Sequence, residues 1–306
     1  MKIEKSLLQI LETQSVSYET EAMQAVMVDL LYKAGANITR DSMGNIYAVK
    51  GVPKKGSYYP CYCAHLDTVH DIQPEGLEVV QLKGGWLAAM SGQTQVGIGG
   101  DDKAGLWAAL KCLQELPCCK VALWVDEEVG CVGSYAADLS FFDNCAFVGQ
   151  ADRRGGGDFV TRIGGESLSS PEFLHAVSPL LLRHGFNACT GAMTDVEALR
   201  NGGLALSVFN MSAGYFDPHT SQETLHLPTL ERVIAFMVDC GRNLKCTRWE
   251  FPAPRPKSWG KAWGKPSDKR KSDDTERLRD WYSKHESFPD YDGDGDSEAP
   301  VLPWQF

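Results

Sequence analysis

Three short, nearly continuous apolar runs constrain the fold of this chain more than any other feature. Residues 58–64, 120–125 and 145–150 read YYPCYCA, KVALWV and CAFVGQ. A strand that is apolar at successive positions is buried on both faces, as in the central sheet of an α/β protein. Further strands are expected at 45–50 and 204–210, and helices at 3–13, 19–34, 102–116, 194–201 and 228–243. The pattern over residues 1–245 therefore predicts a three-layer α/β sandwich with a mixed, mostly parallel central sheet.

Histidine and carboxylate side chains follow these predicted strands or lie at the start of a predicted helix. In chain order they are His65, Asp67, Asp101, Glu127, Glu128, Asp152 and His219. Any one of them alone is weak evidence, because a single His after a strand is more often a surface residue than a ligand. The carboxyl ends of parallel strands meet at one edge of the sheet, so the whole set is expected to converge there.

A pair of metal ions would explain these residue types. Zinc binds imidazole nitrogen and carboxylate oxygen, and a catalytic site leaves one position for water. Two zinc ions about 3.5–4 Å apart need a carboxylate between them, and the stretch GIGGDDKAG offers two adjacent aspartates. The pair Glu127 and Glu128 offers one carboxylate as a ligand and one as a base. Asp67 suits a residue that orients the ring of His65.

The stretches HLDT, GGDDKAG, DEEVG and PHTSQE resemble, in this order, the motifs of the co-catalytic zinc peptidases. They are most similar to the tripeptidase and carboxypeptidase clan, and the resemblance covers roughly residues 1–243. It implies two bound zinc ions, with cobalt or manganese as alternatives. The implied roles are His65 and Asp152 as ligands of one ion, Glu128 and His219 as ligands of the other, Asp101 as the bridge, Glu127 as the general base and Asp67 as the partner of His65. It also implies a cis peptide bond between Asp101 and Asp102.

The spacing of the motifs leaves no room for the lid domain that many tripeptidase-like relatives carry. Residues 153–193, 41 in all, separate Asp152 from Thr194, fewer than the roughly 50 that a domain needs. The layout therefore resembles the single-domain zinc aminopeptidases, and it implies hydrolysis of short peptides by metal-activated water. Two alternatives stay open: a deacylase acting on N-acyl amino acids or another small amide, and a catalytically silent metal-binding scaffold.

Charge and hydropathy argue against two classes of partner. The formal net charge is −10 and the pI is about 5.2, which disfavours nucleic acid. No apolar run reaches the roughly 18 residues of a membrane span. The N-terminal stretch lacks the apolar block of a signal peptide, and the ten cysteines include no CxxC pair. A cytoplasmic protein with reduced thiols is therefore expected.

Composition changes near residue 246. Residues 246–306 are rich in Pro, Trp and charge and poor in aliphatic side chains, so they are expected to form a largely extended or disordered tail. A short helix at 273–285 and docking of the tail to a protein partner are further expectations. The rest of the chain, residues 1–245, is expected to form one catalytic domain, called the body below.

Three other residues near the motifs have two readings each. Thr194, in TGAMTDVEAL, either lines the substrate pocket or caps the helix that follows. Lys103 could act in catalysis, but a lysine in the first turn of a helix is more often a solvated charge. His70 is likewise more often a solvated loop residue than a ligand.

Overall fold

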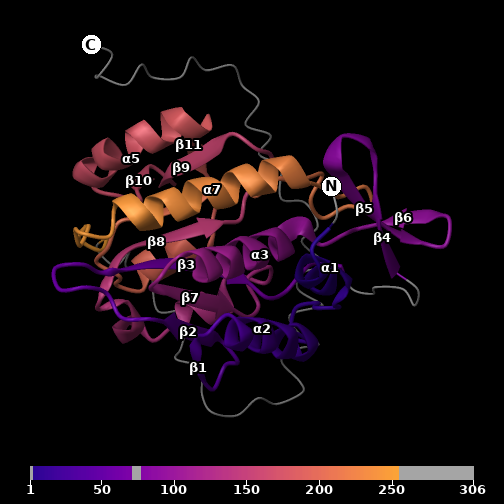
Figure 1. Cartoon of the computed structure of the whole chain (residues 1–306), viewed down its shortest axis with the longest axis horizontal. Helices are drawn as coiled ribbons and strands as arrows, with labels where there is room; N and C mark the ends of the chain where they lie inside the picture. The colour runs from indigo at the N-terminus through magenta and orange to yellow at the C-terminus, as the bar shows by residue number, and fades with distance from the viewer. Residues whose placement is uncertain (1–2, 71–76, 255–306) are drawn as a thin grey trace, which may run out of the picture. The chain divides into compact units, whose positions relative to one another are not determined.

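The predicted apolar runs form the central strands of a nine-stranded sheet in the computed structural model, which describes residues 3–70 and 77–254 (Figure 1). Its strands are β1 (Asn37–Arg40), β2 (Ile46–Lys50), β3 (Tyr59–His65), β7 (Cys119–Trp124), β8 (Cys145–Ala151), β9 (Asp158–Ile163), β10 (Glu166–Ser167), β11 (Asn187–Gly191) and β12 (Val208–Met211). Their order is β1-β2-β7-β3-β8-β12-β9-β10, with β11 beside β9. The central strands β7, β3, β8 and β12 run parallel to one another, and β1, β2, β9 and β10 join this path antiparallel.

Helices cover both faces of the sheet. They are α1 (Lys5–Glu12), α2 (Glu21–Lys33), α3 (Gly100–Glu115), α4 (Val132–Tyr135), α5 (Pro171–His184), α6 (Asp195–Asn201) and α7 (Leu227–Asn243). One apolar core joins the sheet to α1, α2, α3, α5 and α7, and a second core joins the opposite face to α6 and the 3-10 turn η2 (Leu139–Phe142). In Figure 1 the helices α3 and α7 lie side by side across the sheet. The predicted three-layer α/β sandwich is confirmed.

Strand β3 shows why the apolar runs are continuous. Its side chains alternate between the two cores: Tyr62 and Ala64 pack in the first, and Cys61 and Cys63 in the second. All four are fully buried. Burial on both faces requires apolar side chains at every position. The strand ends at His65, which therefore lies at the edge of the sheet.

A second, five-stranded antiparallel sheet was not predicted. It contains β4 (Leu77–Gln81), β5 (Trp86–Ser91), β6 (Thr94–Val96), β13 (Tyr215–Phe216) and β14 (Thr224–His226). Figure 1 shows β4, β5 and β6 extending to one side of the central sheet. Strand β14 pairs with β5, so the loop that carries His219 is attached to the chain segment before α3. Except for β5, these strands are very short or partly exposed, so they lack the apolar runs by which β3, β7 and β8 were recognised. Strands β1, β9, β10 and β11 of the central sheet were not predicted either.

Helix α5 was also missed, although its ends carry ordinary signals. The Ser170 hydroxyl accepts a hydrogen bond from the Phe173 amide at 3.2 Å, Pro171 occupies the first turn, and Gly185 ends the helix in a left-handed conformation. Pro179 inside the helix masks the periodic pattern, because an internal proline usually marks a break.

The first residues of the predicted tail pack on the body. Trp249 donates its amide to the Ala146 carbonyl at 2.9 Å, and its ring lies edge-on to Phe173 at 5.7 Å. The buried Arg200 guanidinium donates to the carbonyls of Phe251 and Pro252, both at 2.6 Å. The body therefore extends beyond residue 245. Residues 255–306, including the helix predicted at 273–285, lie outside the described residues.

Chains truncated at two positions will separate these contributions. We expect a chain ending at Pro254 to keep its melting temperature, whereas a chain ending at Lys245 loses the Trp249 packing and leaves Arg200 with fewer acceptors. The free energy of unfolding of the chain ending at Lys245 should fall by about 3 kcal/mol or more. Thermal unfolding of both chains measures the difference, and equal melting temperatures would show that the segment adds nothing to stability.

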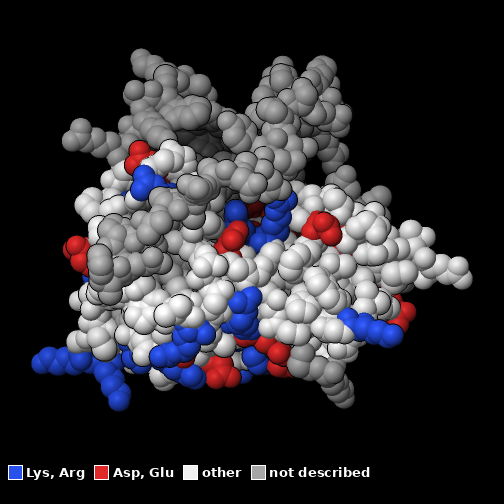
Figure 2. Space-filling model, turned by 90° about the horizontal axis from the view of Figure 1, so that it is seen from above, with Lys and Arg blue, Asp and Glu red and all other residues white. Residues whose placement is uncertain are grey.

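No helix in residues 3–70 and 77–254 is both long and apolar enough to cross a membrane. On the face drawn in Figure 2, side chains of both charge signs are scattered among uncharged residues over the described surface. All ten cysteines are free thiols, and eight of them are buried.

Candidate metal centre

Six of the predicted side chains meet where the central strands end. His65 is the last residue of β3, Asp152 follows β8, and Glu127 and Glu128 follow β7. Asp101 lies in the first turn of α3, and His219 lies in the loop between β13 and β14. Their imidazole and carboxylate groups lie within 3.2–3.9 Å of a neighbour in the set. The convergence expected from the strand pattern is present.

The Asp101 carboxylate lies between the two histidine rings. Its Oδ1 is 3.2 Å from His65 Nε2, and its Oδ2 is 3.3 Å from His219 Nε2. Burial opposes ionisation of Asp101, but the hydrogen bonds from His219 and His65 hold its pKa well below the usual range. Each oxygen thus belongs to a different half of the site.

Each half of the site has one further carboxylate. Asp152 Oδ1 lies 3.6 Å from His65 Nε2, and Glu128 Oε1 lies 3.2 Å from His219 Nε2. Burial raises the pKa of Asp152 to about 7. Contacts with Asp101 and Glu128 raise the pKa of His219 to about 10. The result is one buried group of His65, Asp101 and Asp152, and a second, more open group of His219, Asp101 and Glu128.

Glu127 stands beside this set. Its Oε2 is 3.9 Å from His65 Nε2, farther than the carboxylates of Asp101 and Asp152. Burial raises the pKa of Glu127 well above its ordinary value. A carboxyl group with a raised pKa next to a histidine is suited to accept and return a proton near neutral pH.

Asp67 does more than the sequence suggested. The ring nitrogen His65 Nδ1 lies 2.9 Å from the Asp67 carbonyl oxygen and 3.5 Å from its carboxylate. The carboxylate itself accepts hydrogen bonds from the backbone amides of Glu127 and Glu128, at 2.9 and 3.2 Å, and from Ser17 at 2.8 Å. Asp67 therefore fixes the backbone of the glutamate pair as well as the orientation of the His65 ring.

Asp102 has a different environment from its neighbour. It is fully buried, and its carboxylate accepts hydrogen bonds from the amides of Gly105, at 3.0 Å, and His65, at 3.3 Å. A Cβ atom at Gly105 would lie 2.3 Å from Asp102 Oδ1 and 2.6 Å from the Ala151 carbonyl. The glycine of the DDKAG stretch therefore makes room for Asp102. The peptide bond between Asp101 and Asp102 is cis, as expected.

The side chain of Thr194 turns toward the site. It makes no hydrogen bond that caps α6, and its hydroxyl lies 3.0 Å from Asp152 Oδ2 and 3.1 Å from Gln150 Oε1. The geometry thus argues against the helix cap, and it makes buried Thr194 a residue that holds Asp152 and Gln150 in place. Asn210 also holds Asp152, because its side chain accepts from the Asp152 amide at 2.9 Å and donates to its carbonyl at 2.7 Å.

Glu223, four residues after His219, was not singled out from the sequence. Its fully buried carboxylate accepts hydrogen bonds from the amides of Gly99, at 2.8 Å, and Asp101, at 3.0 Å. His70 Nε2 lies 2.9 Å from the same carboxylate. The expectation that His70 is a solvated loop residue was wrong, because this contact holds its ring with 16% of the side chain exposed. Glu223 ties the His219 loop to the first turn of α3.

Lys103 is not a solvated charge, contrary to expectation. The side chain is 1% exposed, and Nζ donates a hydrogen bond to the Leu11 carbonyl at 2.9 Å. Burial lowers the pKa of Lys103 to about 7. It was misread because lysine in a first helical turn usually faces water, whereas here the turn is packed under α1.

Burial of Lys103 should make the stability of the fold depend on pH. Between about pH 7 and 10.5 Lys103 carries a proton in the unfolded chain that it has lost in the folded one, so the contribution of Lys103 to the free energy of unfolding rises with pH. We expect the free energy of unfolding of the native chain, relative to Lys103→Met, to rise by up to about 1.4 kcal/mol per pH unit in this window. Urea unfolding of both chains with chelator at pH 6 and 9.5 measures it. Parallel pH dependences would contradict the lowered pKa.

The residues present fit a pair of divalent cations. The site carboxylates form ion pairs only with histidines among the described residues, and no Lys or Arg pairs with Asp101, Asp152, Glu127 or Glu128 there. Glu128 Oε1 is buried and accepts no hydrogen bond of good geometry within the described chain, although His219 Nε2 is 3.2 Å away. Several buried anions without a compensating cation are costly, and imidazole with carboxylate is a donor set suited to zinc.

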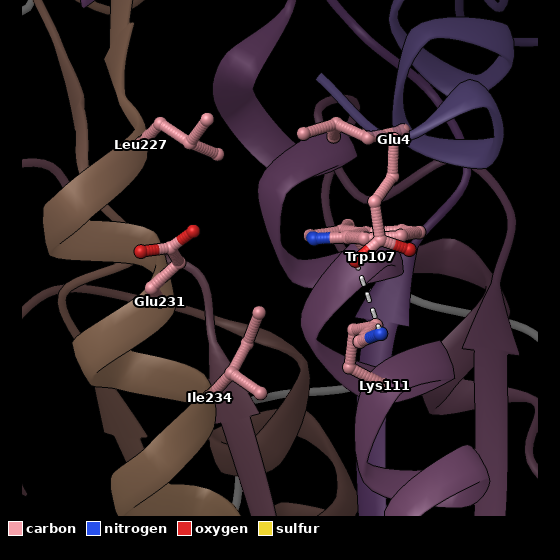
Figure 3. Close-up of a pocket in the computed structure, with 7 residues that line it drawn as sticks. Glu4, Trp107, Lys111, Leu227, Glu231 and Ile234 are labelled. Carbon is pink, nitrogen blue, oxygen red and sulfur yellow. Dashed lines mark hydrogen bonds and ion pairs between the residues drawn. The ribbon is translucent and has the colours of Figure 1, made fainter. Parts of the chain in front are cut away.

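A pocket of about 280 Å³ lies elsewhere, between α1, α3 and α7 (Figure 3). Figure 3 shows Leu227, Glu231 and Ile234 of α7 facing Trp107 and Lys111 of α3, and Lys111 is ion-paired with Glu4 at 3.3 Å. None of the predicted site residues lines this pocket. It is therefore separate from the candidate metal centre.

No protein-family model matches the chain, and no curated protein matches it in sequence. Solved structures match its fold at low identity. The aminopeptidase PepT from Bacillus cereus is 14% identical, with a TM-score of 0.66 over 78% of this chain and 97% of that one. A tripeptidase from Staphylococcus aureus is also 14% identical, with a TM-score of 0.61 over 78% of this chain and 97% of that one. An aminopeptidase from Desulfurococcus kamchatkensis is 14% identical, with a TM-score of 0.62 over 78% of this chain and 94% of that one.

These matches define the class of fold. The chain has the architecture of the metallo-aminopeptidases, and the predicted resemblance to co-catalytic zinc peptidases is confirmed at the level of fold. Buried groups of His, Asp and Glu side chains lie at the edge of its central sheet and are compatible with metal binding.

Proposed function

We propose that this chain is a co-catalytic metallo-aminopeptidase that hydrolyses short peptides. The observation that carries the proposal is the position of Asp101, whose two oxygens lie 3.2 and 3.3 Å from ring nitrogens of His65 and His219. A carboxylate between two imidazoles, each with a carboxylate of its own, has the donors for two ions that share one bridge.

The proposed ligands follow the two halves of the site. His65 and Asp152 hold one ion, His219 and Glu128 hold the other, and Asp101 bridges them. Two zinc ions are the proposed cofactors, with cobalt or manganese as substitutes. When bound, such ions lower the pKa of a coordinated water and polarise an amide carbonyl. The remaining steps belong to side chains of the chain itself.

Glu127 is the proposed general base. It lies beside the ligands, and burial raises its pKa, so it can take a proton from the attacking water and return it to the leaving amine. Asp67 holds the backbone of Glu127 and Glu128 through the hydrogen bonds described above and so keeps the base and the adjacent ligand in register. A catalytically silent scaffold would not need a buried carboxylate beside its ligands.

The preference for aminopeptidase activity rests on the similar structures, which include an aminopeptidase, a tripeptidase and an archaeal aminopeptidase. The free thiols fit a reducing compartment such as the cytoplasm. A short peptide or small amide is the proposed substrate.

Metal-depleted protein tests this proposal when zinc, cobalt or manganese is added back stepwise. We expect hydrolysis of di- and tripeptides with a free amino terminus to appear with the second equivalent of metal. Peptides blocked by acetylation serve as the matched substrates. Hydrolysis confined to N-acyl amino acids would establish the deacylase alternative instead, and metal binding without turnover on any of these substrates would establish the scaffold.

A further inference from the structure

The described residues contain a group of metal-binding side chains that the two proposed ions do not use. Glu127, Cys131 and Asp195 each offer a ligand atom within 4.8 Å of the others. They come from three adjoining segments: the loop after β7, the residue that precedes α4, and the first residue of α6. Cys131 and Asp195 are fully buried.

The distance between Cys131 and Glu127 also matches metal coordination. The Cys131 thiol donates a hydrogen bond to Glu127 Oε1, with Sγ 3.4 Å from the oxygen. Zinc bonds of about 2.3 Å to sulfur and about 2.0–2.2 Å to oxygen in a tetrahedral arrangement place the two ligand atoms about 3.5 Å apart. The pair is thus spaced for a shared cation with little movement.

Asp195 provides the independent observation. Gln150 Nε2 donates to Asp195 Oδ2 at 2.8 Å and fixes the carboxylate, while Oδ1 is buried and accepts no hydrogen bond of good geometry among the described residues. The nearby Ser134 hydroxyl donates to the Cys131 carbonyl at 3.1 Å and also lies within reach of the Asp195 carboxylate. A buried carboxylate oxygen without a partner is costly, and a cation in this group would satisfy it.

Glu127 belongs to both groups through different oxygens. Its Oε2 faces His65 at 3.9 Å, and its Oε1 faces Cys131. We infer that Glu127, Cys131 and Asp195 form a third metal site, which takes a zinc-like divalent cation and inhibits the enzyme by engaging the general base. The inhibitory part rests on the proposed function, but binding of the cation does not.

Binding involves no redox change. The cation accepts lone pairs from Glu127 Oε1, an Asp195 oxygen and the Cys131 sulfur, and the thiol proton leaves to solvent. The sulfur ligand selects zinc, cobalt or cadmium over magnesium, calcium and manganese, which prefer oxygen. Manganese can therefore support activity without binding at this third site.

Cobalt titration of the full chain tests the site without substrate. We expect a thiolate-to-cobalt charge-transfer band that appears after the first two equivalents have bound. Cys131→Ser and Cys131→Ala should lose this band, with third-site affinity lowered by more than roughly 100-fold, and should keep the first two equivalents. Cys189→Ser is the matched control, because this half-buried thiol belongs to none of the groups of metal-binding side chains in the described residues. It should behave like the native chain.

The inhibitory role has its own readout. Each chain's rate of peptide hydrolysis is first measured with two equivalents of zinc and then with excess zinc. The excess should slow the native chain and Cys189→Ser at least about tenfold more than it slows Cys131→Ser. Absence of the band in the native chain, or its persistence in Cys131→Ser, overturns the site. Equal inhibition of all variants overturns the inhibitory role. A band in a chain that hydrolyses no peptide overturns the proposed function and leaves the third site standing.

Discussion

Replacing Glu127 by Gln is expected to abolish turnover while two metal ions stay bound. The amide keeps the size of the side chain but cannot accept the proton of the attacking water. Loss of a general base costs about 10²–10⁴-fold in rate, and more where the same group also returns the proton. The measurement pairs the peptide-hydrolysis rate with metal content after dialysis.

The neighbouring Glu128→Gln is the matched control for this variant. Its oxygen lies against His219 rather than beside His65, and an amide is a poorer zinc ligand than a carboxylate. We therefore expect one ion to be lost on dialysis. If instead Glu127→Gln loses metal and Glu128→Gln keeps it, Glu127 is the ligand and Glu128 the base. Full activity in both variants would show that this is not the active site.

Replacing Glu223 by Gln should weaken metal binding without removing any proposed ligand. The carboxylate accepts from the amides of Gly99 and Asp101 and from His70. Glutamine has one acceptor oxygen, and its NH₂ group would face a donor. Each buried donor left unpaired costs about 1–3 kcal/mol, and loss of groups that orient a ligand typically lowers metal affinity about 10–100-fold.

Competition with a chelator measures the metal affinity of this variant. Glu166→Gln makes the same chemical change on an exposed side chain of β10 and should leave the affinity unchanged. If Glu223→Gln binds both ions as tightly as the native chain, the backbone of Asp101 does not depend on this carboxylate.

The architecture was predictable because its central strands are buried on both faces. Runs such as KVALWV leave few other interpretations, and the residues that follow them lie at the sheet edge by topology alone. This is why His65, Asp152 and the glutamate pair could be placed together before any coordinates. The choice of Asp101 over Asp102 came from the resemblance. In the structure Asp101 lies between the two histidine rings, whereas Asp102 lies near His65 and Asp152 and accepts hydrogen bonds from the amides of Gly105 and His65.

The residues that sequence missed act through backbone groups or through burial. Glu223 accepts from two amides, and no sequence pattern marks which amides a distant carboxylate will meet. Lys103 was misread for a related reason, since its burial depends on α1 packing over the first turn of α3. Three strands of the small antiparallel sheet, β6, β13 and β14, escaped notice because strands of two or three residues carry too few side chains to show a period.

The difference in exposure between the two histidines bears on how the ions would enter and leave. The His65 side chain is 1% exposed, whereas that of His219 is 50% exposed and its backbone has a φ of 63°, in a loop between two very short strands. A ligand held in such a conformation at the protein surface can be released by a local opening that leaves the central sheet intact. We therefore expect unequal residence times: the ion beside His219 exchanges readily with the medium, and the ion beside His65 stays through purification. Cobalt offered to zinc-loaded protein should then give a mixed-metal enzyme with cobalt at the exposed position alone.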